Sequence, residues 1–260
     1  MNYDENVVVM VTHFFFMFLR ITAIFTVSPV FGRKNVPAIA KIGFSILLTA
    51  ILFGVYPSTE GNIDRNLLEF FMICIKQLMV GLVMGIITTC FFSTVTTAGQ
   101  IIDIHIGFNS ASMFDPQYNT QISLTGSLFN YILLICFFLV DGHLMLIRLI
   151  GESFRLIPVE HVVIKPQIAM AFTEIFVKAF VISIQMAMPI IAASLISEVV
   201  MGVLMKMVPQ LNFFVVGFPI KIGLGLFVLL AMIPVFVNSS NGLFENMINA
   251  ISNVFEGMVT

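Results

Sequence analysis

The sequence contains very few charged residues. Only 10% of its 260 residues are Asp, Glu, Lys or Arg, whereas soluble globular domains contain about 25%. Apolar residues make up 59% of the chain, and the mean hydropathy is +1.05. The available charge cannot cover a water-exposed surface for a chain of this length. The composition therefore excludes a soluble globular protein and indicates that much of the surface faces lipid or other apolar protein.

Other absences exclude whole classes of function. The net charge is −2 and no run of Lys or Arg occurs, which excludes the basic patch that nucleic-acid binding needs. The three cysteines form no Cys-x-x-Cys pair, the four histidines are scattered, and no phosphate-binding Gly-x-x-x-x-Gly-Lys motif is present. We therefore expect no metal, no cofactor and no enzymatic activity. An intramembrane hydrolase built on Asp141, His143 or Glu174 stays open as an alternative, although Gly142 favours a helix break there.

Long apolar stretches indicate an all-α, polytopic membrane protein. No connection between them is long enough to fold as a separate soluble domain, so we expect a single membrane domain over residues 1–260. Six spans are predicted: Val7–Val27, Val36–Tyr56, Leu67–Phe92, Leu124–Ile150, Ile168–Ile196 and Phe213–Val237.

Several charged residues lie inside or at the edge of these spans. A charge near the bilayer centre costs about 2.5–3.5 kcal/mol, so Lys76, Arg148 and Lys221 must be paired, hydrated or outside the membrane. Glu174 and Lys178 have the i,i+4 spacing of an intrahelical ion pair, and a contact with a neighbouring subunit is the alternative.

Two further features predict helix packing. Gly81 and Gly85 form a Gly-x-x-x-Gly pattern, which allows two helices to approach closely. Near the C-terminus, apolar residues repeat at steps of three and four, which predicts an amphipathic helix at about residues 241–258. Its polar face has no Lys or Arg, so we expect it to dock on a partner protein rather than on lipid, through Phe244, Met247, Ile251 and Phe255.

The connection after the third span is rich in glycine, small polar residues, Met and Phe. We interpret residues 99–120 as irregular, with a break at Asp115-Pro116. An irregular segment at membrane depth must line a cavity or pack within protein, whereas an ordinary hydrated loop is the alternative.

Together these motifs resemble the FliR family, the R-type subunit of the flagellar type III secretion export gate, which is related to the T-type subunit of injectisomes. The resemblance covers nearly the whole chain. Its motifs are Arg20 with Pro29-Val-Phe-Gly32 and Lys41, Gly99 and Asp103 leading to Gly107-Phe108 and Asp115-Pro116, Gly142-His143 with Ser153 and Ile157-Pro158, and Pro209-Gln-Leu-Asn-Phe213 with Gly217-Phe-Pro-Ile-Lys221. Asp141 departs from the Asn or Gly that the family pattern suggests.

The resemblance implies bent helical hairpins in a helical pore assembly. Implied partners are the P-type and Q-type gate subunits, the B-type switch subunit, the A-type export subunit, unfolded export substrates and lipid, in the bacterial inner membrane at the flagellar basal body. A secondary transporter of a small solute is the alternative function. The resemblance implies a pore plug at Gly107, Phe108, Ser110, Met113, Phe114, Asp115 and Pro116. We assign subunit packing or charge pairing to Arg20, Lys41, Lys76, Gly81, Gly85, Asp103, Glu174, Lys178 and Lys221.

Overall fold

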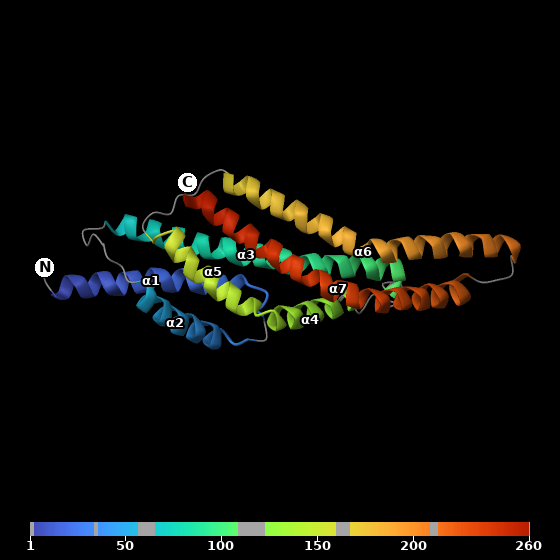
Figure 1. The fold of residues 1–260 in the computed structure, drawn as a ribbon, viewed down its shortest axis with the longest axis horizontal. Helices are drawn as coiled ribbons and strands as arrows, with labels where there is room; N and C mark the ends of the chain where they lie inside the picture. The colour runs from blue at the N-terminus through green and yellow to red at the C-terminus, as the bar shows by residue number, and fades with distance from the viewer. Residues whose placement is uncertain are drawn as a thin grey trace. The chain divides into compact units, whose positions relative to one another are not determined.

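The structure is a computed structural model that describes residues 3–33, 36–56, 66–108, 123–159, 167–208 and 213–259. Every regular element in these ranges is an α-helix, so the predicted all-α class is confirmed. Figure 1 shows the chain order. The helices are α1 (Tyr3–Val27), α2 (Ala38–Val55), α3 (Leu67–Ile106), α4 (Leu124–Leu139), α5 (Gly142–Leu156), α6 (Gln167–Met207) and α7 (Phe213–Val259).

The chain folds into two compact units, each built from segments that are far apart in the sequence. Unit 1 comprises Met1–Cys90, Asp141–Ile175 and Glu245–Thr260, and unit 2 comprises Phe91–Val140 and Phe176–Phe244. The helices α3, α6 and α7 each contribute residues to both units. The expectation of one membrane domain stays a prediction.

Phenylalanine rings make several of the core contacts in each unit. In unit 1, α1 packs along α2, and Phe25 makes edge-to-face contacts with Phe31 and Phe44. In unit 2, the buried Phe137 contacts both Phe92 of α3 and Phe244 of α7. Such ring contacts contribute about 0.5–1.5 kcal/mol beyond the area that they bury.

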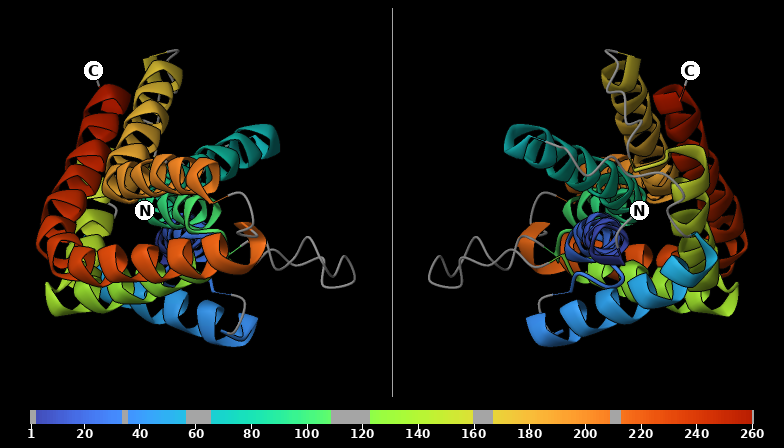
Figure 2. Two further views of the ribbon diagram at one scale, coloured as in Figure 1. Left: turned by 90° about the vertical axis from the view of Figure 1, so that its right-hand side faces the viewer. Right: turned by 90° about the vertical axis from the view of Figure 1, so that its left-hand side faces the viewer.

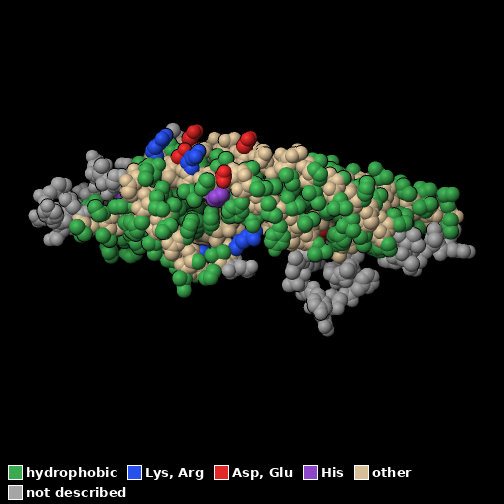
Figure 3. Space-filling model, turned by 60° about the horizontal axis from the view of Figure 1, so that its bottom comes forward, with side chains coloured by type: hydrophobic (Ala, Val, Ile, Leu, Met, Phe, Trp, Pro, Cys, Tyr) green, Lys and Arg blue, Asp and Glu red, His purple; other side chains and the backbone are tan. Residues whose placement is uncertain are grey.

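Much of the outer surface is apolar. Five helices are long and apolar enough to cross a membrane, or six if α4 and α5 count as one broken span. Large apolar side chains are exposed along all five, among them Ile39, Leu68, Phe176 and Phe227. The face drawn in Figure 3 is accordingly covered mostly by hydrophobic side chains, with few charged groups. This surface fits a lipid or protein surround and not water.

Three helices are longer than the hydropathy pattern predicts. Instead of ending near Phe92, Ile196 and Val237, the helices α3, α6 and α7 continue to Ile106, Met207 and Val259. The prediction of irregular structure is therefore wrong for residues 99–106, which are helical. The expected C-terminal helix at 241–258 is the last part of α7 rather than a separate element.

The fourth predicted span is interrupted where the sequence suggests a break. Asp141 has a left-handed conformation, with φ of 55°, and separates α4 from α5. Few non-glycine residues adopt this conformation, and Asp is among those that tolerate it best. The Asp141-Gly142 pair therefore marks a structural break, as the sequence predicts.

Candidate functional site

The largest fully buried side chain in the described residues belongs to Arg20 of α1, and it joins three helices of unit 1. Its Nε donates to Gln77 Oε1 of α3 at 2.7 Å. Its two terminal nitrogens donate to the backbone oxygens of Ser153 at 2.8 Å and Ile157 at 3.0 Å, at the end of α5. The guanidinium also lies 4.4 Å from the ring centroid of Phe154. Arg20 is therefore an intrachain connector.

The end of α5 suits a buried cation because its last carbonyl groups carry the negative end of the helix dipole, and Ser153 O accepts from Arg20 in addition to Ile157 N–H. Gln77 completes the network, since its Nε2 donates to Val159 O at 2.8 Å. The predicted charge pairing of Arg20 is thus met by carbonyl groups instead of a carboxylate. Gln77 and Ser153 are hydrogen-bond partners of Arg20 that were not predicted from the sequence.

Gly81 and Gly85 bring α3 close to α1, which is the close helix approach that the pattern predicts. A Cβ atom at Gly81 would lie 2.3 Å from Arg20 O, and one at Gly85 would lie 2.8 Å from Val27 Cβ. These distances exclude any side chain unless the backbones separate. The contact lies within the chain, next to Arg20, and not between subunits.

Asp103 connects α3 to α4 in unit 2. Its carboxylate is buried and accepts hydrogen bonds from Ser123 Oγ at 2.6 Å and Thr125 N at 3.2 Å. Ser123 is the N-cap residue of α4 and accepts from Gly126 N at 2.9 Å. The two helices touch one turn away, because a Cβ at Gly99 would lie 2.2 Å from Gly126 Cα. A carboxylate at a helix N-terminus is favoured by the helix dipole.

The last turn of α3 also contacts the other two helices of unit 2. Ser194 Oγ of α6 donates to His105 O at 3.0 Å, and a Cβ at Gly225 of α7 would lie 2.7 Å from Ile106. Figure 2 shows the end of α3, in green, between α6 and α7. Gly107 ends the helix with φ of 96°, a conformation that strongly favours glycine.

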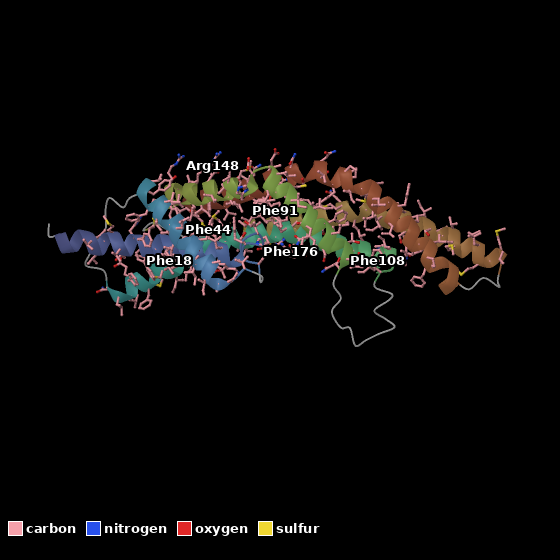
Figure 4. All side chains as sticks on the ribbon, turned by 90° about the horizontal axis from the view of Figure 1, so that it is seen from below. Phe18, Phe44, Phe91, Phe108, Arg148 and Phe176 are labelled. Atoms are coloured by element: carbon pink, nitrogen blue, oxygen red, sulfur yellow. The ribbon has the colours of Figure 1, made fainter. Side chains whose placement is uncertain are left out.

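Most of the predicted plug falls outside the described residues. Ser110, Met113, Phe114, Asp115 and Pro116 lie there, and Gly107 and Phe108 are the plug residues that the structure describes. Gly107 is buried and Phe108 is partly buried, at the end of α3 (Figure 4).

The remaining charged candidates have separate positions. Lys221 of α7 forms an ion pair with Glu198 of α6 at 2.5 Å, and Glu198 is a partner that sequence reasoning missed. Lys41 Nζ donates to Gly32 O at 2.9 Å, within the chain. Lys76 is partly buried, while Glu174 and Lys178 are exposed. The predicted pair between Glu174 and Lys178 stays a prediction.

The C-terminal apolar stripe is not available to a partner. Phe244, Met247, Ile251 and Phe255 are at most 3% exposed in the chain by itself. The prediction that this face docks on another subunit is therefore wrong, because the chain's own core covers it. What α7 exposes near its end is a polar face that includes Glu245 and Asn249.

The described residues contain no group of three or more His, Cys, Asp or Glu side chains able to hold a metal ion. Asp141 and Glu174 are exposed, and His143 is partly buried near the start of α5. Each unit has its own buried polar helix junction, at Arg20 in unit 1 and at Asp103 in unit 2.

The sequence is similar to that of known bacterial export proteins. The model of the family described as "Bacterial export proteins, family 1" matches residues 11–247. The chain is 33% identical over 248 residues to the flagellar biosynthetic protein FliR of Bacillus subtilis, covering 93% of each chain. The chain belongs to the FliR family. It is 27% identical over 243 residues to FliR of Escherichia coli, covering 93% of this chain and 92% of that one. It is 26% identical over 229 residues to FliR of Aquifex aeolicus, covering 88% of each.

Family membership and the apolar helices together identify the location of the chain in the cell. It is an inner-membrane subunit of the flagellar type III export apparatus, in the basal body. The family resemblance inferred from Arg20, Asp103 and the motif ending at Lys221 is thereby confirmed.

Proposed function

We propose that this FliR-family chain assembles with P-type and Q-type subunits into the membrane pore through which unfolded flagellar proteins are exported. Its role is to build and seal the pore, without catalysing a reaction. Contacts with the B-type switch subunit and the A-type export subunit belong to the same proposal.

The ion pair between Glu198 and Lys221 is the observation that carries this proposal. The side chain of Glu198 is 47% exposed and that of Lys221 is 18% exposed. Their neighbours along α6 and α7 include exposed Leu195, Ile196 and Leu224. Lipid would accept the apolar neighbours, but the pair with Lys221 leaves the Glu198 side chain 47% exposed, and the uncovered part of its charge would need water or polar protein around it. An assembly with partner proteins outside and water inside accommodates both the exposed apolar side chains and the partly exposed charge of Glu198.

The pore is sealed in this proposal by residues 107–119. Met113 and Phe114 supply apolar bulk that excludes water and ions. Methionine suits a seal that must yield to many polypeptides, since its unbranched thioether packs against varied side chains without specific hydrogen bonds. Gly107 allows the chain to turn sharply at the end of α3, as its positive φ supports.

Purification from native membranes tests the assembly. A tagged chain is expected to co-elute with the P-type and Q-type subunits, while the chain expressed alone in detergent is expected to aggregate because its exposed apolar surface has no partner. The Glu198→Lys variant should lower recovery of both partners, since it places two cations together. Glu152→Lys, at an exposed position on α5, is the matched control and should not.

One result of this purification would refute the proposed pore. A stable, monodisperse monomer that binds a small solute and co-elutes with no export subunit would favour a secondary transporter and would refute the proposed pore.

A further inference from the structure

The outward face of α3 in unit 1 carries a regular row of large apolar side chains, here called the α3 seam. Its members alternate at steps of four and three residues over about five helical turns. Each is 38–76% exposed, and together they are Leu68, Met72, Ile75, Met79, Leu82 and Ile86. A 3.5-residue repeat of large apolar residues is the pattern by which one helix packs along another. The α3 seam is therefore suited to receive a second helix.

The other side of α3 is already held within the chain. Ile73, Val80 and Ile87 are at most 7% exposed. Gln77 accepts a hydrogen bond from the buried Arg20, and Gly81 lies against the backbone of α1. Because these contacts fix the helix, the α3 seam needs little rearrangement to bind a partner, which lowers the entropic cost of association.

Lys76 lies at the edge of the α3 seam, four residues after Met72 and three before Met79. It is partly buried, and among the described residues it forms no ion pair. The closest carboxylate along α3, that of Glu69, is seven residues away, a rise of about 10 Å. A cation inside an apolar face is stable only when it is paired or hydrated. The α3 seam therefore needs an anion from whatever covers it.

Lipid cannot satisfy the α3 seam and Lys76 together. A phosphate headgroup could neutralise Lys76 only at the membrane surface, yet the seam continues on both sides of this residue, to Leu68 in one direction and Ile86 in the other. With Lys76 at the headgroups, one end of the seam would project into water. With Lys76 inside hydrocarbon, its charge would have no partner.

We propose that the α3 seam binds a membrane helix of a neighbouring export subunit, which carries an apolar face and an Asp or Glu that pairs with Lys76. This inference rests on the proposed assembly and specifies one of its contacts. The two helices should pack lengthwise, at the small crossing angle that a 3.5-residue repeat gives.

Crosslinking of the full chain in native membranes tests what covers the α3 seam. A photo-reactive residue at Ile75 or Met79 should form adducts with one export subunit. Dicyclohexylcarbodiimide, which enters membranes and joins an amine to a carboxylate in contact with it, should link the native Lys76 to an Asp or Glu of the same subunit. Lys76→Arg should lose this link, since a guanidinium does not react, yet keep normal recovery of that subunit.

Substitutions measure how much the α3 seam contributes to assembly. Lys76→Glu should lower recovery of that subunit several-fold, because two carboxylates would then face each other. Arg148→Glu, at an exposed position on α5, is the matched control and should not. The Ile75→Ala, Met79→Ala double variant should also lower recovery, whereas Ile46→Ala with Ile51→Ala, exposed on α2, should not.

The outcomes separate this inference from the proposed function. If the native chain co-elutes with export subunits while probes at Ile75 and Met79 label only lipid, the assembly stands and the inference is wrong. If the chain co-elutes with no export subunit, both fail. Equal recovery with Lys76→Glu and Lys76→Arg would overturn the ion pair. Should Lys76→Glu fail to reach the membrane, absence of a carbodiimide link at the native Lys76 would overturn it instead.

Discussion

Replacing Arg20 by methionine is expected to remove most of the chain from the membrane. Methionine has similar length but no donor, so Gln77 Oε1 and Ile157 O would lose their buried partner, and Ser153 O would keep only its hydrogen bond from Ile157 N–H. Each buried acceptor left without a hydrogen bond costs about 1–3 kcal/mol. For two such acceptors the summed cost is a large fraction of the stability of a typical domain, which is about 5–15 kcal/mol.

The effect should depend on donor geometry and not on charge alone. Arg20→Lys keeps the positive charge at the end of α5 but cannot reach three acceptors with the planar guanidinium arrangement, so an intermediate loss is expected. Arg148→Met is the matched control, because Arg148 lies on the exposed face of α5 (Figure 4).

Immunoblots of membrane fractions and thermal unfolding of the detergent-solubilised complex measure this loss. Normal abundance and an unchanged unfolding temperature in Arg20→Met would show that the Arg20 network does not hold α1, α3 and α5 together.

Deleting Ser110–Phe114 is expected to leave assembly largely intact while raising ion leakage strongly. The segment supplies the apolar bulk of the proposed seal, whereas the helix junctions at Arg20 and Asp103 lie outside it. Export should be retained or mildly impaired, because a translocating polypeptide itself fills the pore. Ion flux across inverted membrane vesicles, with and without the complex, measures the leak.

Graded substitutions test whether the leak results from the loss of side-chain volume at Met113 and Phe114. Met113→Leu should stay ion-tight, since it conserves volume, and the Met113→Gly, Phe114→Gly double variant should leak. Ile46→Ala, at an exposed position on α2, controls for general membrane damage. An assembled deletion complex as ion-tight as the parent would exclude this segment as the principal seal.

Hydropathy identifies the helices but not where they end. The pattern fades after Phe92 because Thr94, Gly99 and Asp103 are typical of loops when considered alone. In the fold these residues face inward: Thr94 and Asp103 are buried, and Gly99 lies against Gly126. Tertiary contacts therefore extend α3 through residues that local propensity would place outside a helix.

Contacts between residues that are distant in sequence could not be predicted either. The sequence marks Arg20 as a charge that must be satisfied, yet Ser153 lies 133 residues away. The stripe of Phe244, Met247 and Ile251 correctly indicates an apolar partner, but periodicity cannot say whether that partner belongs to another chain. Burial shows that it belongs to the same one. The Asp141-Gly142 break was predictable because its cause is local backbone conformation.

The most direct test of the central claim is to ask whether an exported polypeptide passes this chain. A photo-crosslinking residue placed at Met113 or Phe114 in the assembled apparatus should form covalent adducts with a stalled flagellar export substrate. The same residue at Ile46, on the exposed apolar face of α2, should form none. Adducts at the first two positions are the result that a sealed export pore predicts. Their absence, in complexes where the substrate is shown to be stalled in transit, would contradict it.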